Sequence, residues 1–162
     1  MEKVIMFRND MLLGRFLRFQ GAFDESLIHL QRAYDSLSQC KCLSFDGDLR
    51  DLSSDYASTL RELEKPLSAE NHLRTEIARR EQRNISSGSS ALKICLAEAL
   101  FTQERFSEAE ALCLEVKSYP GLSRIEKLRL YIILAKQYHV KDENNTAFSR
   151  WNEALKEIPS LS

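Results

Sequence analysis

The stretch LGRFLRFQGAFDESL, residues 13–27, decides the fold of this chain. From its small residue Gly14, the chain places a characteristic side chain at fixed steps of 3, 9, 4 and 3 residues, namely Leu17, Ser26, Leu30 and Ala33. The same steps recur three more times without a gap, and each copy opens on a small residue: Gly14, Ala57, Ala97 and Ala135. A long period built from helical spacings indicates a stacked array of helix pairs.

Each position of this skeleton has a physical role in pairing two helices. The opening small residue lets the two helices of a pair cross closely, and the step of nine residues passes over a tight turn into the second helix. There a second small residue again allows close approach: Ser26, Ala69, Ala109 and Ala147. The residue four positions later is large in three copies and is predicted to pack toward the next unit: Leu30, Leu73, Cys113 and Trp151.

The helical periodicity predicts eight helices, at residues 3–20, 23–38, 47–63, 66–83, 89–103, 106–118, 123–140 and 144–157. Pro66 suits a first helical turn, where its missing N–H group costs nothing. We expect three residue pairs to cap the free N–H groups at helix N-termini or to interact favourably with the helix dipole there: Asp24-Glu25, Ser107-Glu108 and Asn144-Asn145. The serine-rich stretch 84–90 is short, so we interpret it as a loop between repeats.

The composition agrees with an all-α chain. Five glycines and three prolines in 162 residues fit long helices with short connections, and the net charge of −1 gives no basic excess for nucleic acid. No apolar run is long enough to span a membrane, and the N-terminus has no signal-peptide pattern. We therefore expect a cytoplasmic protein with reduced thiols.

Residues 13–27 resemble a tetratricopeptide repeat, and the turn Gly21-x-Phe23-x-Glu25 is similar to that of the longer repeats in kinesin light chains and many fungal proteins. Glu104-x-Phe106-x-Glu108 repeats this turn. The resemblance implies a right-handed α-solenoid in one domain over residues 1–162, with repeats at about 7–40, 47–83, 89–119 and 123–159. The small residues lie 43, 40 and 38 residues apart, whereas the usual tetratricopeptide period is about 34. The second repeat departs most, with Glu76 in place of a small residue.

In this family the first helix of each pair lines a concave groove that holds the ligand. The resemblance places the following residues there: Arg8, Met11, Arg15, Phe19, Ser54, Ser58, Arg61, Ile94, Glu98, Phe101, Arg129, Ile132, Lys136 and His139. The Lys, Asn and Arg clamp by which family members hold acidic peptide tails is not reproduced. The groove is instead mixed, with apolar residues that would be costly to leave in water. The alternative is that these residues are buried in the protein itself.

Few residues could do chemistry. Glu98 and His139 are the only groove pair suited to acid–base work, but Glu98 is better explained as a carboxylate that is solvated or paired with arginine, and His139 as a helix-end histidine. His29 and His72 are expected on the surface. Cys40 and Cys42 could bind metal or form a redox pair, but their spacing is tighter than the usual zinc pattern, so we interpret them as structural. We expect no cofactor and no metal.

Two hypotheses follow. The first is a noncatalytic scaffold that holds a peptide, a helix or a partner protein in its groove, with a homodimer as a further option because the array shows no polar cap. The second is a small enzyme or carrier, of an isomerase or cyclase type, that encloses an apolar metabolite and acts by shape and a few polar groups. The fold favours the first.

Overall fold

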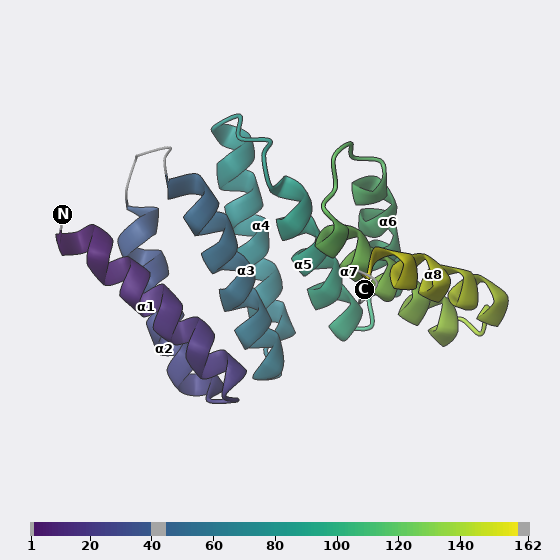
Figure 1. Ribbon diagram of the computed structural model, residues 1–162, viewed down its shortest axis with the longest axis horizontal. Coiled ribbons are helices and arrows are strands. Elements are labelled where there is room, and N and C mark those ends of the chain that lie inside the picture. Colours follow the sequence, from purple (N-terminus) through teal and green to yellow (C-terminus); the bar gives the residue numbers. More distant parts are fainter. Residues whose placement is uncertain (1, 40–44, 159–162) are drawn as a thin grey trace. The chain divides into compact units, whose positions relative to one another are not determined.

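The computed structural model describes residues 2–39 and 45–158. These residues form eight α-helices and no strand (Figure 1): α1 Glu2–Phe19, α2 Phe23–Ser38, α3 Asp46–Glu62, α4 Pro66–Gln82, α5 Ser89–Thr102, α6 Phe106–Lys117, α7 Arg124–Val140 and α8 Asn144–Glu157. Every predicted helix boundary lies within one residue of the observed one. None of these helices combines the length and apolar content that crossing a bilayer requires.

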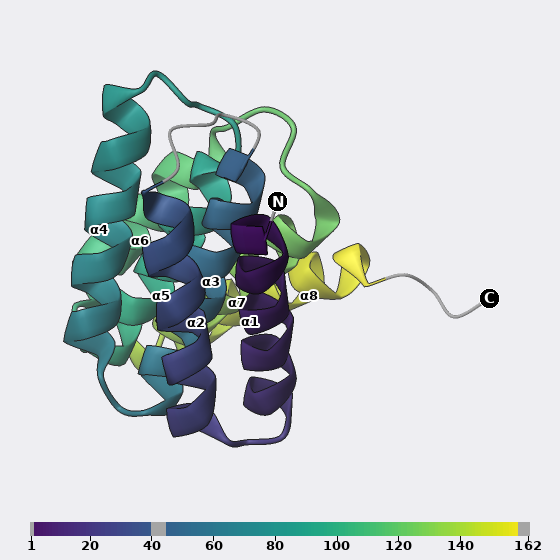
Figure 2. The ribbon, with the colours of Figure 1, turned by 90° about the vertical axis from the view of Figure 1, so that its left-hand side faces the viewer.

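The chain divides into two compact units, Met1–Gly88 and Ser89–Ser162, and the boundary falls in the serine-rich stretch. Each unit holds two helix pairs, and in Figure 2 the antiparallel pair α1 and α2 faces the viewer. In both units the first helix of the second pair packs on both helices of the first pair, α3 on α1 and α2, and α7 on α5 and α6. This is the packing of an all-α helical repeat of the solenoid class. The single domain expected over residues 1–162 stays a prediction.

All four helix pairs share one turn. The residue seven positions after the opening small residue has a left-handed backbone in every copy: Gly21 (φ 79°), Glu64 (57°), Glu104 (60°) and Asp142 (61°). The next amide N–H donates back to the carbonyl five residues earlier, as in Ala22 to Leu17 at 2.9 Å and Lys65 to Leu60 at 2.8 Å. This is the Schellman pattern that ends helices, and its recurrence shows that the repeat is structural as well as sequential.

The small residues of the skeleton are buried at every copy. A Cβ atom added to Gly14 would lie 2.7 Å from the Leu30 side chain, so only glycine fits where α1 crosses α2. Ser26, which takes the second small position in the first repeat, is fully buried, and its hydroxyl donates to the Gly14 carbonyl at 2.7 Å. A buried hydroxyl with such a bond costs little, which explains why serine replaces alanine there.

The departure at Glu76 is accommodated by pairing. Glu76 is fully buried, and the Arg79 guanidinium donates to both of its carboxylate oxygens, at 2.7 and 2.9 Å. Arg79 also reaches Asp46 at 3.4 Å, which ties α4 to the start of α3. A buried carboxylate is tolerated when a partner neutralises it, so this repeat uses an ion pair where the other three have an uncharged residue, Ala33, Val116 or Ala154.

The predicted capping groups at the helix N-termini were only partly correct. Pro66 opens α4, as expected. No side chain caps α2, α6 or α8, although Asp24, Glu25 and Glu108 lie in first turns, where they favour the helix dipole. The capping box is at α7 instead, where Ser123 and Glu126 bond each other's backbone N–H groups at 3.3 and 2.8 Å.

Candidate functional site

The basic residues predicted in the groove of the first unit are engaged with α3. Arg15 is ion-paired with Asp55, which also accepts from Arg18 at 3.3 Å. Arg8 lies 4.0 Å from Asp48, and its side chain is 59% exposed. Arg15 and Arg18 therefore tie α1 to α3, whereas Arg8 has only a weak surface pair and remains accessible.

The other predicted residues of the first unit divide between core and surface. Met11 is buried in a core cluster with Phe7, Leu30 and Leu52, so it presents no open surface. Phe19 is 80% exposed at the end of α1. On α3, Ser54, Ser58 and Arg61 are half-buried, and the Ser54 hydroxyl donates to the Arg50 carbonyl.

In the second unit, Glu98 of α5 is held by Arg129 of α7. The guanidinium donates to both carboxylate oxygens, at 2.8 and 2.9 Å, and also lies 3.1 Å from the Cys95 sulfur. Burial lowers the pKa of Arg129, but the interactions with Cys95 and Glu98 outweigh this effect, so the pKa is raised above its ordinary value. Glu98 is thus paired with arginine, which agrees with its interpretation as an arginine-paired carboxylate and not as an acid–base group.

The remaining predicted residues of the second unit do not assemble a reactive site. Ile94 is fully buried in a core cluster, and Phe101 packs edge-to-face against Phe106 with ring centroids 5.2 Å apart. Ile132 is half-buried, and Lys136 and His139 are exposed. The His139 ring lies 3.3 Å from the Asn144 amide oxygen.

Glu98 and His139 are not brought together. The Glu98 carboxylate is bound to Arg129, which precedes His139 on α7 by ten residues, or about 15 Å along the helix axis. An acid–base pair requires hydrogen-bond reach. The arrangement therefore gives no geometric support for acid–base chemistry between these two residues.

A histidine that was expected on the surface is enclosed instead. His72 of α4 lies against two tyrosines, with ring centroids 4.6 Å from Tyr34 of α2 and 4.7 Å from Tyr56 of α3. Burial lowers the pKa of His72 to about 4, and its Nε2 atom has no hydrogen-bond partner in the described part of the chain. His29, expected on the surface too, contacts Asp10 at 2.8 Å and is half-buried.

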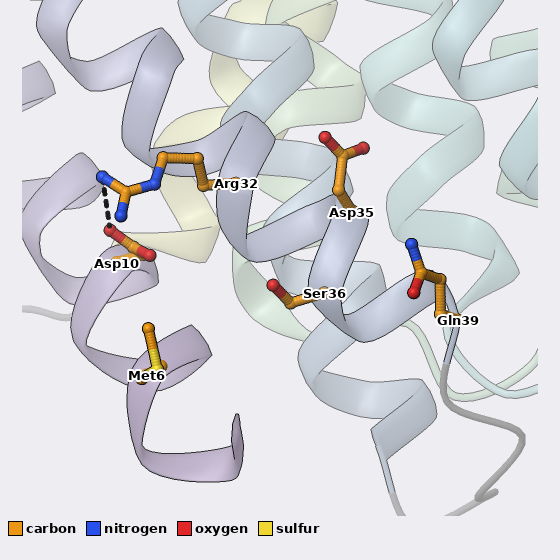
Figure 3. A pocket seen from close by; sticks show the side chains of 6 residues that line it. All are labelled: Met6, Asp10, Arg32, Asp35, Ser36 and Gln39. Atoms are coloured by element: carbon orange, nitrogen blue, oxygen red, sulfur yellow. Dashed lines mark ion pairs between the residues drawn. The ribbon is translucent and has the colours of Figure 1, made fainter. Parts of the chain in front are cut away.

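A hollow of about 410 Å³ lies between α1 and α2 (Figure 3) and was not foreseen from the sequence. Its lining residues, all polar except for Met6, are Met6, Asp10, Arg32, Asp35, Ser36 and Gln39. Arg32 points across the hollow to Asp10 at 3.8 Å, and Asp35 accepts from Gln31 at 2.8 Å. The size suits a small ligand. Its charged groups, however, already have protein partners.

Two exposed apolar faces were not predicted as such, although Phe19 of the first was placed in the groove. Leu12, Phe16 and Phe19 are exposed along α1, with Met6 and Leu13 beside them. Phe148, Trp151, Leu155 and Ile158 are exposed along α8 and its C-cap. In a soluble chain, contiguous apolar surfaces of this kind usually mark interaction sites.

The described thiols and possible metal ligands give little support for a functional site. Cys95 and Cys113 are free and buried, and burial raises the pKa of the Cys113 thiol to about 12. Within the described residues, no group of three or more His, Cys, Asp or Glu side chains is arranged to hold a metal ion. Cys40 and Cys42, which were considered as a metal or redox pair, lie outside the described residues.

Comparison with known proteins supports the fold. No family model matches the chain. None of the curated proteins matches it either. Among solved structures, the chain is similar to the crystal structure of BtubC (BKLC) from P. vanneervenii, with a TM-score of 0.73 and 12% sequence identity. The match covers 96% of this chain and 64% of the BtubC chain. At this identity the likeness concerns the fold alone, which is a tetratricopeptide-like helical repeat.

Proposed function

We propose that the protein is a noncatalytic binding scaffold that holds an amphipathic helix of a partner protein against α1. The observation that carries the proposal is the apolar face of this helix. Leu12, Phe16 and Phe19 are 59, 58 and 80% exposed, and their spacing of four and three residues places them on one side of α1. A partner helix would cover such a stripe with its own apolar face.

The charges beside the stripe suggest what the partner looks like. Arg8 and Arg15 each lie four residues before a stripe residue, so they border the same face, but Arg15 is already paired with Asp55 and only Arg8 is available to a partner. Arg8 is accessible, and its pair with Asp48 is too long to satisfy it fully. An amphipathic helix with acidic side chains along one edge would therefore match both the apolar face and its basic border.

The alternative function, enclosure of an apolar metabolite, loses its main support. It depended on apolar residues lining an open groove, but Met11 and Ile94 belong to the cores of the two units. Glu98 and Arg129, two of its polar groups, neutralise each other. The scaffold is the better proposal, and we place it in the cytoplasm, where the buried thiols of Cys95 and Cys113 would stay reduced.

The first test is a crosslinking experiment. The photoreactive residue p-benzoylphenylalanine replaces Phe19 on α1 in one strain and Ile28 on α2 in the control strain, since both positions are exposed and apolar. We expect a crosslinked partner from position 19 and none from position 28. Mass spectrometry then identifies the partner and its crosslinked segment.

The second test measures the purified partner directly. A large apolar side chain contributes roughly 1.5–3 kcal/mol when it becomes fully buried, so Phe16→Asp should weaken binding at least about tenfold. Ile28→Asp is the matched control and should leave the dissociation constant unchanged. Equal binding by the Phe16→Asp variant, or crosslinks only at position 28, would refute the assignment to α1.

A further inference from the structure

The second exposed apolar face, on α8, has the spacing of a helix seam. Phe148, Trp151, Leu155 and Ile158 follow one another at steps of three, four and three residues, the alternation of a and d positions in a coiled coil. They are 68, 39, 61 and 50% exposed. We call these four residues the α8 stripe.

Trp151 shows that this face is a packing surface of the fold. It occupies the skeleton position held in the other three repeats by Leu30, Leu73 and Cys113, and those three side chains are fully buried. In the fourth repeat, no described helix lies over the equivalent position, and an aromatic residue stands there exposed. This face therefore carries residue types that pack against a helix, and it is exposed among the described residues.

We propose that a second copy of this chain docks on the α8 stripe, so that two α8 helices pack antiparallel in a symmetric dimer. An antiparallel arrangement makes the stripe complementary to itself. Trp151 then meets Leu155 of the second copy, and Phe148 meets Ile158 of the second copy. Symmetric dimers are by far the commonest oligomers and require a self-complementary patch of this kind.

The charge pattern favours a second copy over an unrelated partner. In a coiled-coil register the α8 stripe is flanked on one side by Asn145 and Asn152 and on the other by Ala147 and Ala154, which are buried within the unit, so only the asparagine side is accessible. A symmetric dimer brings flanking residues of the same sequence close together, so charged residues on the accessible side would repel, whereas the amides of Asn145 and Asn152 do not. The apolar stripe on α1 differs, because the accessible Arg8 that borders it would oppose its self-pairing.

The area of the stripe is sufficient for a stable dimer. Taking about 150–250 Å² for each fully exposed large side chain, the observed exposed fractions amount to roughly 400 Å² of apolar surface per copy. A standard interface buries about 800 Å² per partner, and roughly 460–520 Å² of this is apolar. The α8 stripe alone thus supplies most of the apolar area that such an interface takes from one partner.

The test uses the full-length protein under reducing conditions. Trp151 is the only tryptophan of the chain, so its fluorescence reports directly on this surface. Sedimentation velocity and tryptophan emission are measured together from nanomolar to high micromolar concentration. We expect the mass to double and the emission to shift to the blue over the same concentration range.

Two matched variants place the interface. Leu155→Glu on α8 should be monomeric at every concentration while keeping its helical circular dichroism, whereas Phe16→Glu on α1 should dimerise like the unmodified chain. Should Leu155→Glu fail to fold, Phe148→Glu gives the same comparison. A chain that stays monomeric at high micromolar concentration, a mass that grows beyond the dimer, or a dimer disrupted by Phe16→Glu and not by the α8 variants would each overturn the proposal.

Discussion

His72 should make the first unit unstable in mild acid. Its ring lies between Tyr34 and Tyr56, and burial lowers its pKa from the usual 6.5 to about 4. In the folded state the His72 side chain therefore stays neutral down to low pH, whereas in the unfolded chain it takes up a proton near pH 6.5. The stability that depends on neutral His72 is complete above that pH and is lost as the pH falls toward 4.

The size of the effect follows from the two pKa values. A difference of one unit in pKa corresponds to about 1.4 kcal/mol. The full difference of about 2.5 units therefore lowers the free energy of unfolding by about 3 kcal/mol below pH 4. At pH 5 the unfolded histidine is almost fully protonated and the folded one is mostly neutral, which gives a loss of about 2 kcal/mol relative to pH 8. Burial and the nearby Glu76 raise the pKa of Tyr34 to about 12, and burial and Asp35 raise the pKa of Tyr56.

The measurement is urea unfolding at a series of pH values between 4.5 and 8, followed by circular dichroism. His72→Phe is the control, because phenylalanine fills the space between the tyrosines and does not titrate. The difference in unfolding free energy between the two proteins isolates His72 from carboxylates that titrate in the same range. A difference that stays constant between pH 8 and pH 5 would refute the reasoning, as would a His72 carbon shift in NMR that titrates near pH 6.5.

Three further changes test the packing. Gly14→Ala should lower the unfolding free energy by about 1 kcal/mol, because the crowding of Leu30 outweighs the gain in helix propensity, and unfolding in urea measures it. Glu104→Gly should raise the free energy of unfolding by up to about 1 kcal/mol, and with it the melting temperature, because Glu104 has a left-handed backbone with a φ of 60° that glycine adopts without strain. A lower melting temperature would show that this backbone is not strained. Glu98→Ala should cost about 2–3 kcal/mol by leaving Arg129 buried without its partner, and a double-mutant cycle with Arg129→Met should show strong coupling.

The fold could be predicted because its signal is repeated. Gly14, Ala57, Ala97 and Ala135 all lie at close helix crossings, and four copies in one phase leave little freedom in assigning the helices. The left-handed backbone of the shared turn was signalled by residue type most clearly at Gly21, since Glu64 and Glu104 are not typical of that conformation. The hydrogen bonds that fix the turn come from the backbone and carry no sequence signal of their own.

The candidate site was harder because it depends on small rotations of a helix. Successive residues are turned by about 100°, so an error of one position moves a side chain from the surface into the core. Met11 and Ile94 were placed on an open face and lie in cores, while Phe19, on the same helix as Met11, is exposed. His72 could not be found by periodicity at all, because its two tyrosine neighbours come from α2 and α3.

Trp151 shows why one sequence pattern can have two meanings. A skeleton position specifies a side chain that fits between helices, but whether it is buried depends on a neighbour that the pattern does not encode. At Leu30, Leu73 and Cys113 that position is buried; at Trp151 the same position is open within the described residues. A residue selected by the fold for helix packing is therefore also suited to bind a helix from another molecule. Interaction surfaces of this repeat are best sought at skeleton positions that the structure leaves exposed, and not only on the first-helix face that the family resemblance indicates.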